Sequence, residues 1–196
     1  MAFRHHRLGS KVRVGILRIG FISDGSLPIP YPIFMGIRIR EFGGSDVEQL
    51  AKLRLLVGGG TLADLEARFL NELNLKDRKI FCSINSQDLI VGYGRVQEHH
   101  IETLDFYSTV GSLPLGWYLR GCIVHPDSRR KNIATLLTEA RLNYLKSKSI
   151  EKTYCFLDSD EKIQLPLYLS KNFKILKEDI QIEYSSDKGT LLLKQE

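Results

Sequence analysis

The sequence predicts an α/β fold, in which a central β-sheet carries helices on its faces. Segments that alternate apolar and polar residues are interspersed with segments of helical periodicity, in the order β-α-α-β-β-β-α-β-α-β-β. The 196 residues are 43% hydrophobic, which is enough to bury the core of one domain without disulfides or metal ions. Neither an internal repeat nor a low-complexity segment interrupts this order.

The first regular element is a strand at residues 37–42, where apolar and polar side chains alternate as in a half-buried strand. Gly43 and Gly44 end it. Ser45, with Glu48 three residues later, predicts a capping box at the start of a helix. The inner face of this helix is predicted to consist of Val47, Leu50, Ala51 and Leu55.

A second helix and a hairpin follow. Thr61 comes after three glycines and is expected to cap the helix. Its inner face is predicted to consist of Leu62, Leu65, Phe69 and Leu73. Residues 79–84 and 89–96 are β-rich and flank the polar residues 85–88, a pattern that predicts a hairpin with a four-residue turn.

The second half continues the alternation after a polar loop at residues 98–114. Strands are predicted at residues 115–124, 152–157, 174–184 and 189–193, with a helix at 132–146 and a shorter one before Phe173.

The positive charge of the chain is concentrated at its N-terminus. The formal net charge is +5, and most of the excess comes from Arg4, Arg7, Lys11, Arg13 and Arg18, which face Asp24 alone within residues 1–36. Residues 1–36 also contain alternating prolines, so they are interpreted as a basic extension and residues 37–196 as the functional domain. Because the domain is nearly neutral, no nucleic-acid-binding face is expected on it.

The cysteines and the hydropathy indicate a cytoplasmic protein. Cys82, Cys122 and Cys155 are odd in number and far apart, which is typical of reduced, packed thiols. No apolar run approaches the roughly 18 residues of a membrane helix, so no membrane contact is expected. Arg13 and Arg18 interrupt the N-terminal apolar run, which argues against a secretory signal.

The most informative segment is a strand, a basic loop and a helix at residues 117–137. Pro126 must end the strand, and the basic residues 129–131 precede a helix that begins near Asn132. Free N–H groups of the first helical turn, the helix dipole and the arginines together favour an anion such as a diphosphate. The alternative is that the basic residues form only a solvated turn. Ile133, Leu136, Leu137, Ala140 and Tyr144 are expected to face the sheet, and Glu139, Arg141 and Lys146 to face water.

This segment resembles the acetyl-CoA motif of the GNAT N-acetyltransferase superfamily, in which a strand ending in Val-x-Pro is followed by Arg/Gln-x-x-Gly-x-Gly/Ala. Val124 and Pro126 match, Arg129 takes the Arg/Gln place and Ala134 takes that of the last small residue. Asn132 stands where the family has glycine.

The resemblance extends over most of residues 37–185. The Val-Gly-Tyr-Gly strand at 91–94 fits it, and residues 167–173 are similar to the family's Leu-Tyr-x-x-x-Gly-Phe, with Asn172 in the glycine place. It implies a mixed, mostly antiparallel sheet with helices on both faces. It also implies that the strand ending at Val124 separates from the strand at 152–157 and admits the pantetheine arm of acetyl-CoA.

For cofactor binding, the resemblance implies two groups of residues. The main chain of Cys122, Ile123 and Val124 would hold the pantetheine, and the loop and helix start would bind the pyrophosphate. The implied set is Cys122, Ile123, Val124, Arg129, Arg130, Lys131, Asn132, Ile133, Ala134, Thr135 and Glu161. Because Asn132 adds a side chain where the pyrophosphate approaches, reduced CoA affinity is expected. Pro166 predicts a late start or a kink in the last helix.

For catalysis, the resemblance implies that Tyr168 protonates the departing CoA thiolate. The amine must lose a proton before it attacks, because an alkyl ammonium has a pKa of about 10.4. Glu98 is the candidate base, and His99, His100, Glu102 and His125 are alternatives. Each of the five, taken alone, is more typical of a surface residue than of a catalytic base.

The predicted function is an acetyl-CoA-dependent N-acetyltransferase that acts on a primary amine of a small molecule or protein, without a metal. The alternative is a CoA-binding protein of the same fold without turnover. The acceptor is not determined by the sequence, and a homodimer remains open.

Overall fold

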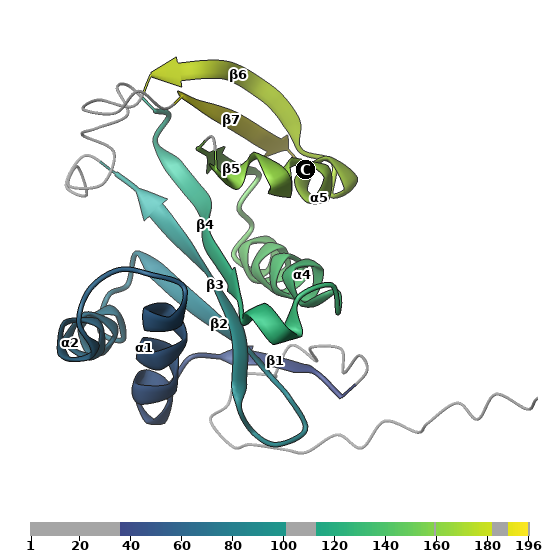
Figure 1. The fold of residues 1–196 in the computed structure, drawn as a ribbon. Helices are drawn as coiled ribbons and strands as arrows, with labels where there is room; N and C mark the ends of the chain where they lie inside the picture. The colour runs from purple at the N-terminus through teal and green to yellow at the C-terminus, as the bar shows by residue number, and fades with distance from the viewer. Residues whose placement is uncertain (1–35, 101–112, 159, 182–187, 196) are drawn as a thin grey trace, which may run out of the picture. The chain divides into compact units, whose positions relative to one another are not determined.

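The computed structural model describes residues 36–100, 113–158, 160–181 and 188–195, which contain one seven-stranded sheet (Figure 1). The strands are β1 (Arg38–Glu41), β2 (Arg78–Ile84), β3 (Ile90–His99), β4 (Gly116–Val124), β5 (Lys152–Leu157), β6 (Lys174–Gln181) and β7 (Lys188–Gln195). Their order is β1-β2-β3-β4-β5-β7-β6, and every pair is antiparallel except β4 and β5. The predicted mixed, mostly antiparallel sheet is therefore confirmed.

The predicted N-terminal extension at residues 1–36 lies, apart from Gly36, outside the described residues. The division of the chain into 1–36 and 37–196 therefore stays a prediction.

Helices cover both faces of the sheet. They are α1 (Val47–Leu56), α2 (Leu62–Glu72), α4 (Ile133–Ser147) and α5 (Leu165–Ser170), with short 3-10 turns η1 (Gly44–Asp46), η3 (Pro126–Ser128) and η4 (Asp160–Gln164). Figure 1 shows α1 and α2 on one side of the central strands and α4 on the other. Among the helices of the described residues, none has the length and apolar character needed to cross a membrane.

Each face of the sheet has its own hydrophobic core, and strand β2 contributes to both. Ile80 packs with Leu50 of α1 and Phe69 of α2. Phe81, the next residue along the strand, packs on the other face with Leu137 of α4. Successive side chains of a strand point to opposite faces, so a strand in the middle of such a sheet must be apolar on both sides.

The hydrogen bonds at the N-terminus of α1 differ from the predicted ones. Ser45 and Glu48 do not form the expected capping box, and Glu48 instead pairs with Lys52 one turn later, at 2.5 Å. The buried carboxylate of Asp46 accepts hydrogen bonds from the Gly43 N–H at 2.8 Å and from the Arg40 guanidinium at 2.5 and 2.6 Å. The bond from Gly43 to Asp46 spans three residues, as one half of a capping box does, but Gly43 has no side chain to signal it, and Arg40 lies on β1.

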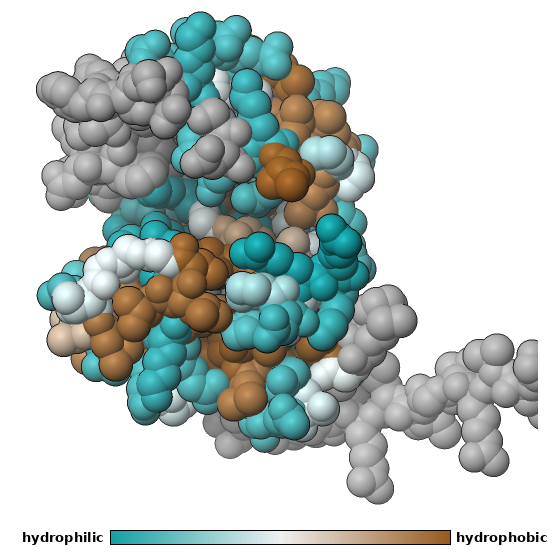
Figure 2. All heavy atoms as spheres, viewed as in Figure 1, coloured by the Kyte–Doolittle hydropathy of each residue, from teal (hydrophilic) through white to brown (hydrophobic). Residues whose placement is uncertain are grey.

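Two leucines predicted to face the core are instead exposed. The exposed fraction is 42% for Leu55 and 37% for Leu73, because the buried stripe of α1 runs through Leu50 and Leu53, and that of α2 through Phe69 and Glu72. Figure 2 shows apolar side chains gathered on the outer surface over α1 and α2.

A close contact between β3, β4 and α4 depends on Gly92. A Cβ atom added to Gly92 would lie 2.9 Å from the Ile123 carbonyl oxygen and 3.2 Å from a methyl group of Ile133. Contacts this short are avoided by real side chains, so glycine lets the start of α4 approach the sheet closely.

We therefore expect Gly92→Ala to lower the free energy of unfolding by about 1–3 kcal/mol, because overpacking forces the surrounding backbone to shift. Chemical denaturation measures this. Gly44→Ala is the matched control, since its added Cβ would lie 3.9 Å from Leu73, an ordinary contact, and should change stability by no more than about 0.5 kcal/mol. Equal stability of the two variants would contradict the close contact at Gly92.

Candidate functional site

Strand β4 separates from the neighbouring strand β5 about half-way along its length. Its antiparallel pairing with β3 continues to Val124, whereas its parallel pairing with β5 ends at Leu119, opposite Cys155. The separation expected between these two strands is therefore present. Beyond Leu119, the edge of β4 that faces β5 has main-chain groups that pair with no strand of the described residues.

A β-bulge at Gly121 accompanies the separation. Gly94 lies opposite Cys122 and Arg95 lies opposite Arg120, so Gly121 is an extra residue in β4. Its φ of +44° is in the left-handed region, which glycine adopts without steric strain. A bulge bends the strand that contains it and increases its twist, so it turns the end of β4 away from β5.

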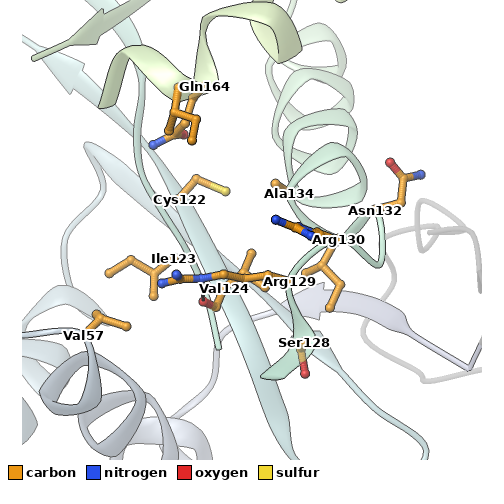
Figure 3. Close-up of a pocket in the computed structure, with 12 residues that line it drawn as sticks. Val57, Cys122, Ile123, Val124, Ser128, Arg129, Arg130, Asn132, Ala134 and Gln164 are labelled. Atoms are coloured by element: carbon orange, nitrogen blue, oxygen red, sulfur yellow. Dashed lines mark hydrogen bonds between the residues drawn. The ribbon is translucent and has the colours of Figure 1, made fainter. Parts of the chain in front are cut away.

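A cavity of about 500 Å³ adjoins the end of β4 (Figure 3). Its walls come from β4, from the loop and first turn of α4, from the end of α1 and from η4. The lining residues are Val57, Cys122, Ile123, Val124, Ser128, Arg129, Arg130, Asn132, Ile133, Ala134, Ile163 and Gln164.

The N-terminus of α4 forms one wall of the cavity. Asn132 occupies the N-cap position, and its side chain caps no N–H group of the first turn. Uncapped N–H groups and the positive end of the helix dipole attract an anion. Arg129, whose Nε lies 3.4 Å from the Val124 carbonyl oxygen, and Arg130 add two positive charges. This wall is suited to a phosphate or diphosphate group.

The structure brings together most of the residues expected to bind the cofactor. Eight of them line the cavity: Cys122, Ile123, Val124, Arg129, Arg130, Asn132, Ile133 and Ala134. Three expected residues do not line it. Lys131 donates a hydrogen bond from Nζ to the Asp127 carbonyl oxygen. Thr135 lies further along α4. The N–H group of Glu161 donates to the carbonyl and the carboxylate oxygens of Asp158.

Sequence reasoning missed Val57, Ser128, Ile163 and Gln164. Ser128 sits inside the basic loop and could have been included from its position alone. Val57 and Ile163 carry no local signal, because α1 and η4 reach the cavity only through the tertiary fold. Ile163 is 87% exposed at the edge of this cavity.

The two asparagines that replace family glycines both have left-handed backbones. The φ angle is 62° at Asn132 and 64° at Asn172, and asparagine tolerates this region better than other residues with a side chain. Figure 3 shows the Asn132 amide extending away from Cys122 and Ile123. Pro166 lies in the first turn of α5, where its missing N–H needs no partner, so the helix accommodates it as predicted by a late start.

Tyr168 is buried on α5 beside the separated strands. It is 2% exposed, does not line the cavity, and packs edge-to-face on Phe173 with ring centroids 5.4 Å apart. Its hydroxyl interacts with Cys155 of β5 and with Arg141 of α4. Burial raises the pKa of Tyr168 well above its ordinary value, and the positive charge of Arg141 opposes that rise. A tyrosine is protonated at neutral pH even at its ordinary pKa of about 10, so the rise keeps the proton on the hydroxyl and also makes it a weaker acid.

The candidate bases are scattered. Glu98 is half-buried opposite Trp117, near the start of β4 and away from the cavity. His99 is buried and packs edge-to-face on Tyr118, and burial, then His100 and Arg120, lower its pKa, so it is neutral at physiological pH. His125 accepts a hydrogen bond from the Asp127 N–H. Glu102 lies outside the described residues.

Arg141 was predicted to face water, and this is wrong. Its side chain is fully buried between α4 and the sheet. It lies four residues after Leu137 and eight after Ile133, which places it on the inner stripe of the helix. The sequence pattern contained this position, but the charge of arginine made burial look unfavourable.

Comparison with known proteins adds the family. Residues 51–173 match the model of the acetyltransferase (GNAT) family. The search of curated proteins found no match. Two similar solved structures are mutant forms of the spermidine/spermine N-acetyltransferase SpeG from Vibrio cholerae and an acetyltransferase of the GNAT family from Streptococcus pneumoniae.

Both similarities cover most of each chain. The Vibrio cholerae structure has a TM-score of 0.61 at 13% identity, over 82% of this chain and 94% of that chain. The Streptococcus pneumoniae structure has a TM-score of 0.60 at 12% identity, over 81% of this chain and 98% of that chain. At these identities the similarity shows a shared fold.

Proposed function

Because this chain belongs to the acetyltransferase (GNAT) family, we propose that it is an N-acetyltransferase that moves the acetyl group of acetyl-CoA to a primary amine. The proposal rests mainly on the geometry at the end of β4. Its main chain separates from β5 beside a cavity that the uncapped N-terminus of α4 also lines.

The residues of the cavity fit the parts of acetyl-CoA. Main-chain groups of Cys122, Ile123 and Val124 have no partner on β5, so they can pair with the amides of a pantetheine arm as a neighbouring strand would. The first-turn N–H groups of α4, with Arg129 and Arg130, are suited to the pyrophosphate. Lys131, Thr135 and Glu161 lie outside the lining, so we assign them no direct contact with acetyl-CoA.

The chemical step needs an oxyanion donor, a proton acceptor and a proton donor. An N–H group at the end of β4 would polarise the thioester carbonyl. Tyr168 would donate a proton to the sulfur that leaves. Glu98 remains the proposed base, acting through water because of its distance along β3 from the cavity, and the neutral His99 is the alternative.

The test is acetyl-CoA binding measured by calorimetry, together with release of free CoA thiol in the presence of a panel of amines. We expect acetyl-CoA at 100 times its Kd to stabilise the protein by about 2.7 kcal/mol against unfolding. The panel should include polyamines, aminoglycosides, amino acids and peptides with free N-termini. Lack of heat and of stabilisation by acetyl-CoA would overturn the proposal.

One observation favours the second candidate function, which is CoA binding without turnover. Among the described residues that line the cavity, none is a carboxylate or a histidine that could serve as a base. Stabilisation by CoA without thiol release across the whole panel would support this alternative.

A further inference from the structure

The buried Arg141 has a role that the binding of acetyl-CoA does not explain. Within the part of the chain that the structure describes, no carboxylate pairs with its guanidinium. It donates instead to neutral oxygens. These are the Leu137 carbonyl at 3.1 Å, the Thr138 hydroxyl at 2.9 Å, and the Arg95 and Arg120 carbonyls at 3.5 Å each.

A buried charge without an opposite charge is unfavourable for folding. Removing a guanidinium from water has a large desolvation penalty, and neutral hydrogen-bond acceptors offset only part of it. If the side chain served only to join α4 to the sheet, a leucine or methionine would do so without that penalty. The charge itself therefore needs an explanation.

The guanidinium lies beneath the bulge, at the point where β4 leaves β5. Arg95 and Arg120, whose carbonyls it contacts, form the ladder pair just before Gly121, and Gly94 and Cys122 form the pair just after it. A Cβ atom on Gly94 would lie 3.0 Å from Arg141 Cζ, so the guanidinium occupies the space that a side chain there would fill.

The neighbours of Arg141 surround the opening between the strands. Cys122 of β4 lines the cavity, Cys155 of β5 is the last residue paired with β4, and Tyr168 of α5 lies across from both. The charge of Arg141 acts on all three of these side chains. A thioester whose arm runs along the end of β4 would have its sulfur close to this charge.

We propose that Arg141 supplies the positive charge that stabilises the sulfur of CoA as the thioester breaks. This inference rests on the proposed function. In the step, the amine nitrogen bonds to the carbonyl carbon and the carbon–sulfur bond breaks. The sulfur keeps the electron pair and takes the Tyr168 proton as it leaves, and the amine gives up its own proton to the base. Negative charge builds on the sulfur only while the carbon–sulfur bond breaks, before the proton arrives, so Arg141 favours the transition state over bound acetyl-CoA.

The experiment measures the acidity of bound CoA directly. Saturating CoA is titrated on the protein and in free solution while the ultraviolet absorbance of the thiolate is followed, and a CoA analogue without sulfur corrects for the protein's own cysteines. We expect binding to raise the acidity of the CoA thiol at least about tenfold, because a cation within several ångströms in a partly buried site favours the thiolate.

Three variants separate charge from structure. Arg141→Lys should keep most of the increase in acidity, whereas Arg141→Met should remove it, with CoA affinity at neutral pH changed less than about threefold because the bound thiol is then neutral. In the acetylation assay, Arg141→Met should lower kcat and leave KM nearly unchanged, and Arg141→Lys should restore part of kcat. Lys146→Met, at an exposed position of the same helix, is the control and should behave as the unaltered protein.

Each outcome decides the inference. Equal acidity of bound and free CoA in the unaltered protein, which requires no variant to fold, overturns the role of Arg141 and leaves the proposed function standing. An increase in acidity that survives Arg141→Met also overturns it. Failure to bind CoA at all overturns the proposed function and this inference together.

Discussion

Replacing Tyr168 with phenylalanine is expected to lower kcat for acetyl transfer by about 100- to 10,000-fold, which is the usual contribution of general acid catalysis. The hydroxyl is buried between α5, β5 and α4, beside the point where β4 and β5 separate, and its raised pKa keeps it protonated at neutral pH. Phenylalanine retains the ring that packs on Phe173, so stability and acetyl-CoA affinity should change little.

The matched control is Tyr144→Phe. Tyr144 is a half-buried tyrosine of α4 whose ring packs on Phe81 with centroids 5.7 Å apart, and burial raises its pKa as well. It lies on the core side of the helix, outside the cavity lining, so this variant should keep full kcat. Steady-state kinetics with a saturating acceptor measure both variants. A Tyr168→Phe enzyme with unchanged kcat would exclude Tyr168 as the proton donor.

The second large effect is expected at the first turn of α4. Ala134→Glu places a carboxylate at the second position of the helix, in the wall that we assign to the pyrophosphate. Repulsion of roughly 3 kcal/mol between the two anions would weaken CoA binding about 100-fold. The same carboxylate interacts favourably with the helix dipole, so the free energy of unfolding without ligand should be unchanged or slightly higher.

Opposite effects on binding and stability make this prediction specific. Ala63→Glu is the matched control, because Ala63 occupies the same second position of α2, is exposed and does not line the cavity. It should leave CoA affinity unchanged. Calorimetry gives the affinities and chemical denaturation the stabilities. Undiminished affinity in Ala134→Glu would show that the α4 N-terminus does not bind the pyrophosphate.

Local patterns in the sequence were sufficient for most of the fold. The β-rich residues 79–84 and 89–96 predicted β2, β3 and a turn between them, although β3 continues to His99 and the turn spans residues 85–89, and strand β5 was predicted at its observed bounds. Patterns of this kind are reliable because a strand or helix must turn one periodic face to the core. The predicted strand at 174–184 is observed as β6 (Lys174–Gln181), and residues 182–184 lie outside the described residues.

The errors concern residues whose partners are distant in the chain. Asp46 replaces the expected capping box because Arg40 of β1 reaches it. Leu55 and Leu73 are exposed, although they lie in the predicted apolar stripes of their helices. Helical periodicity predicts how wide such a stripe is, but not how much of the stripe the neighbouring elements cover. Arg141 is buried because neutral oxygens on α4, β3 and β4 accept its hydrogen bonds, an arrangement with no signature along the chain.

The sequence by itself determined the family resemblance, the α/β class and the position of the basic loop before α4, since these depend on residues that are neighbours along the chain or repeat with a fixed period. Only the tertiary structure decided which groups surround the cavity. Val57 and Ile163 line the cavity, whereas Tyr168 and Arg141 do not. How these four residues are placed depends on the way α1, η4, α5 and α4 pack around the bulged β4. Packing is a property of all the elements together, so no segment read alone contains it.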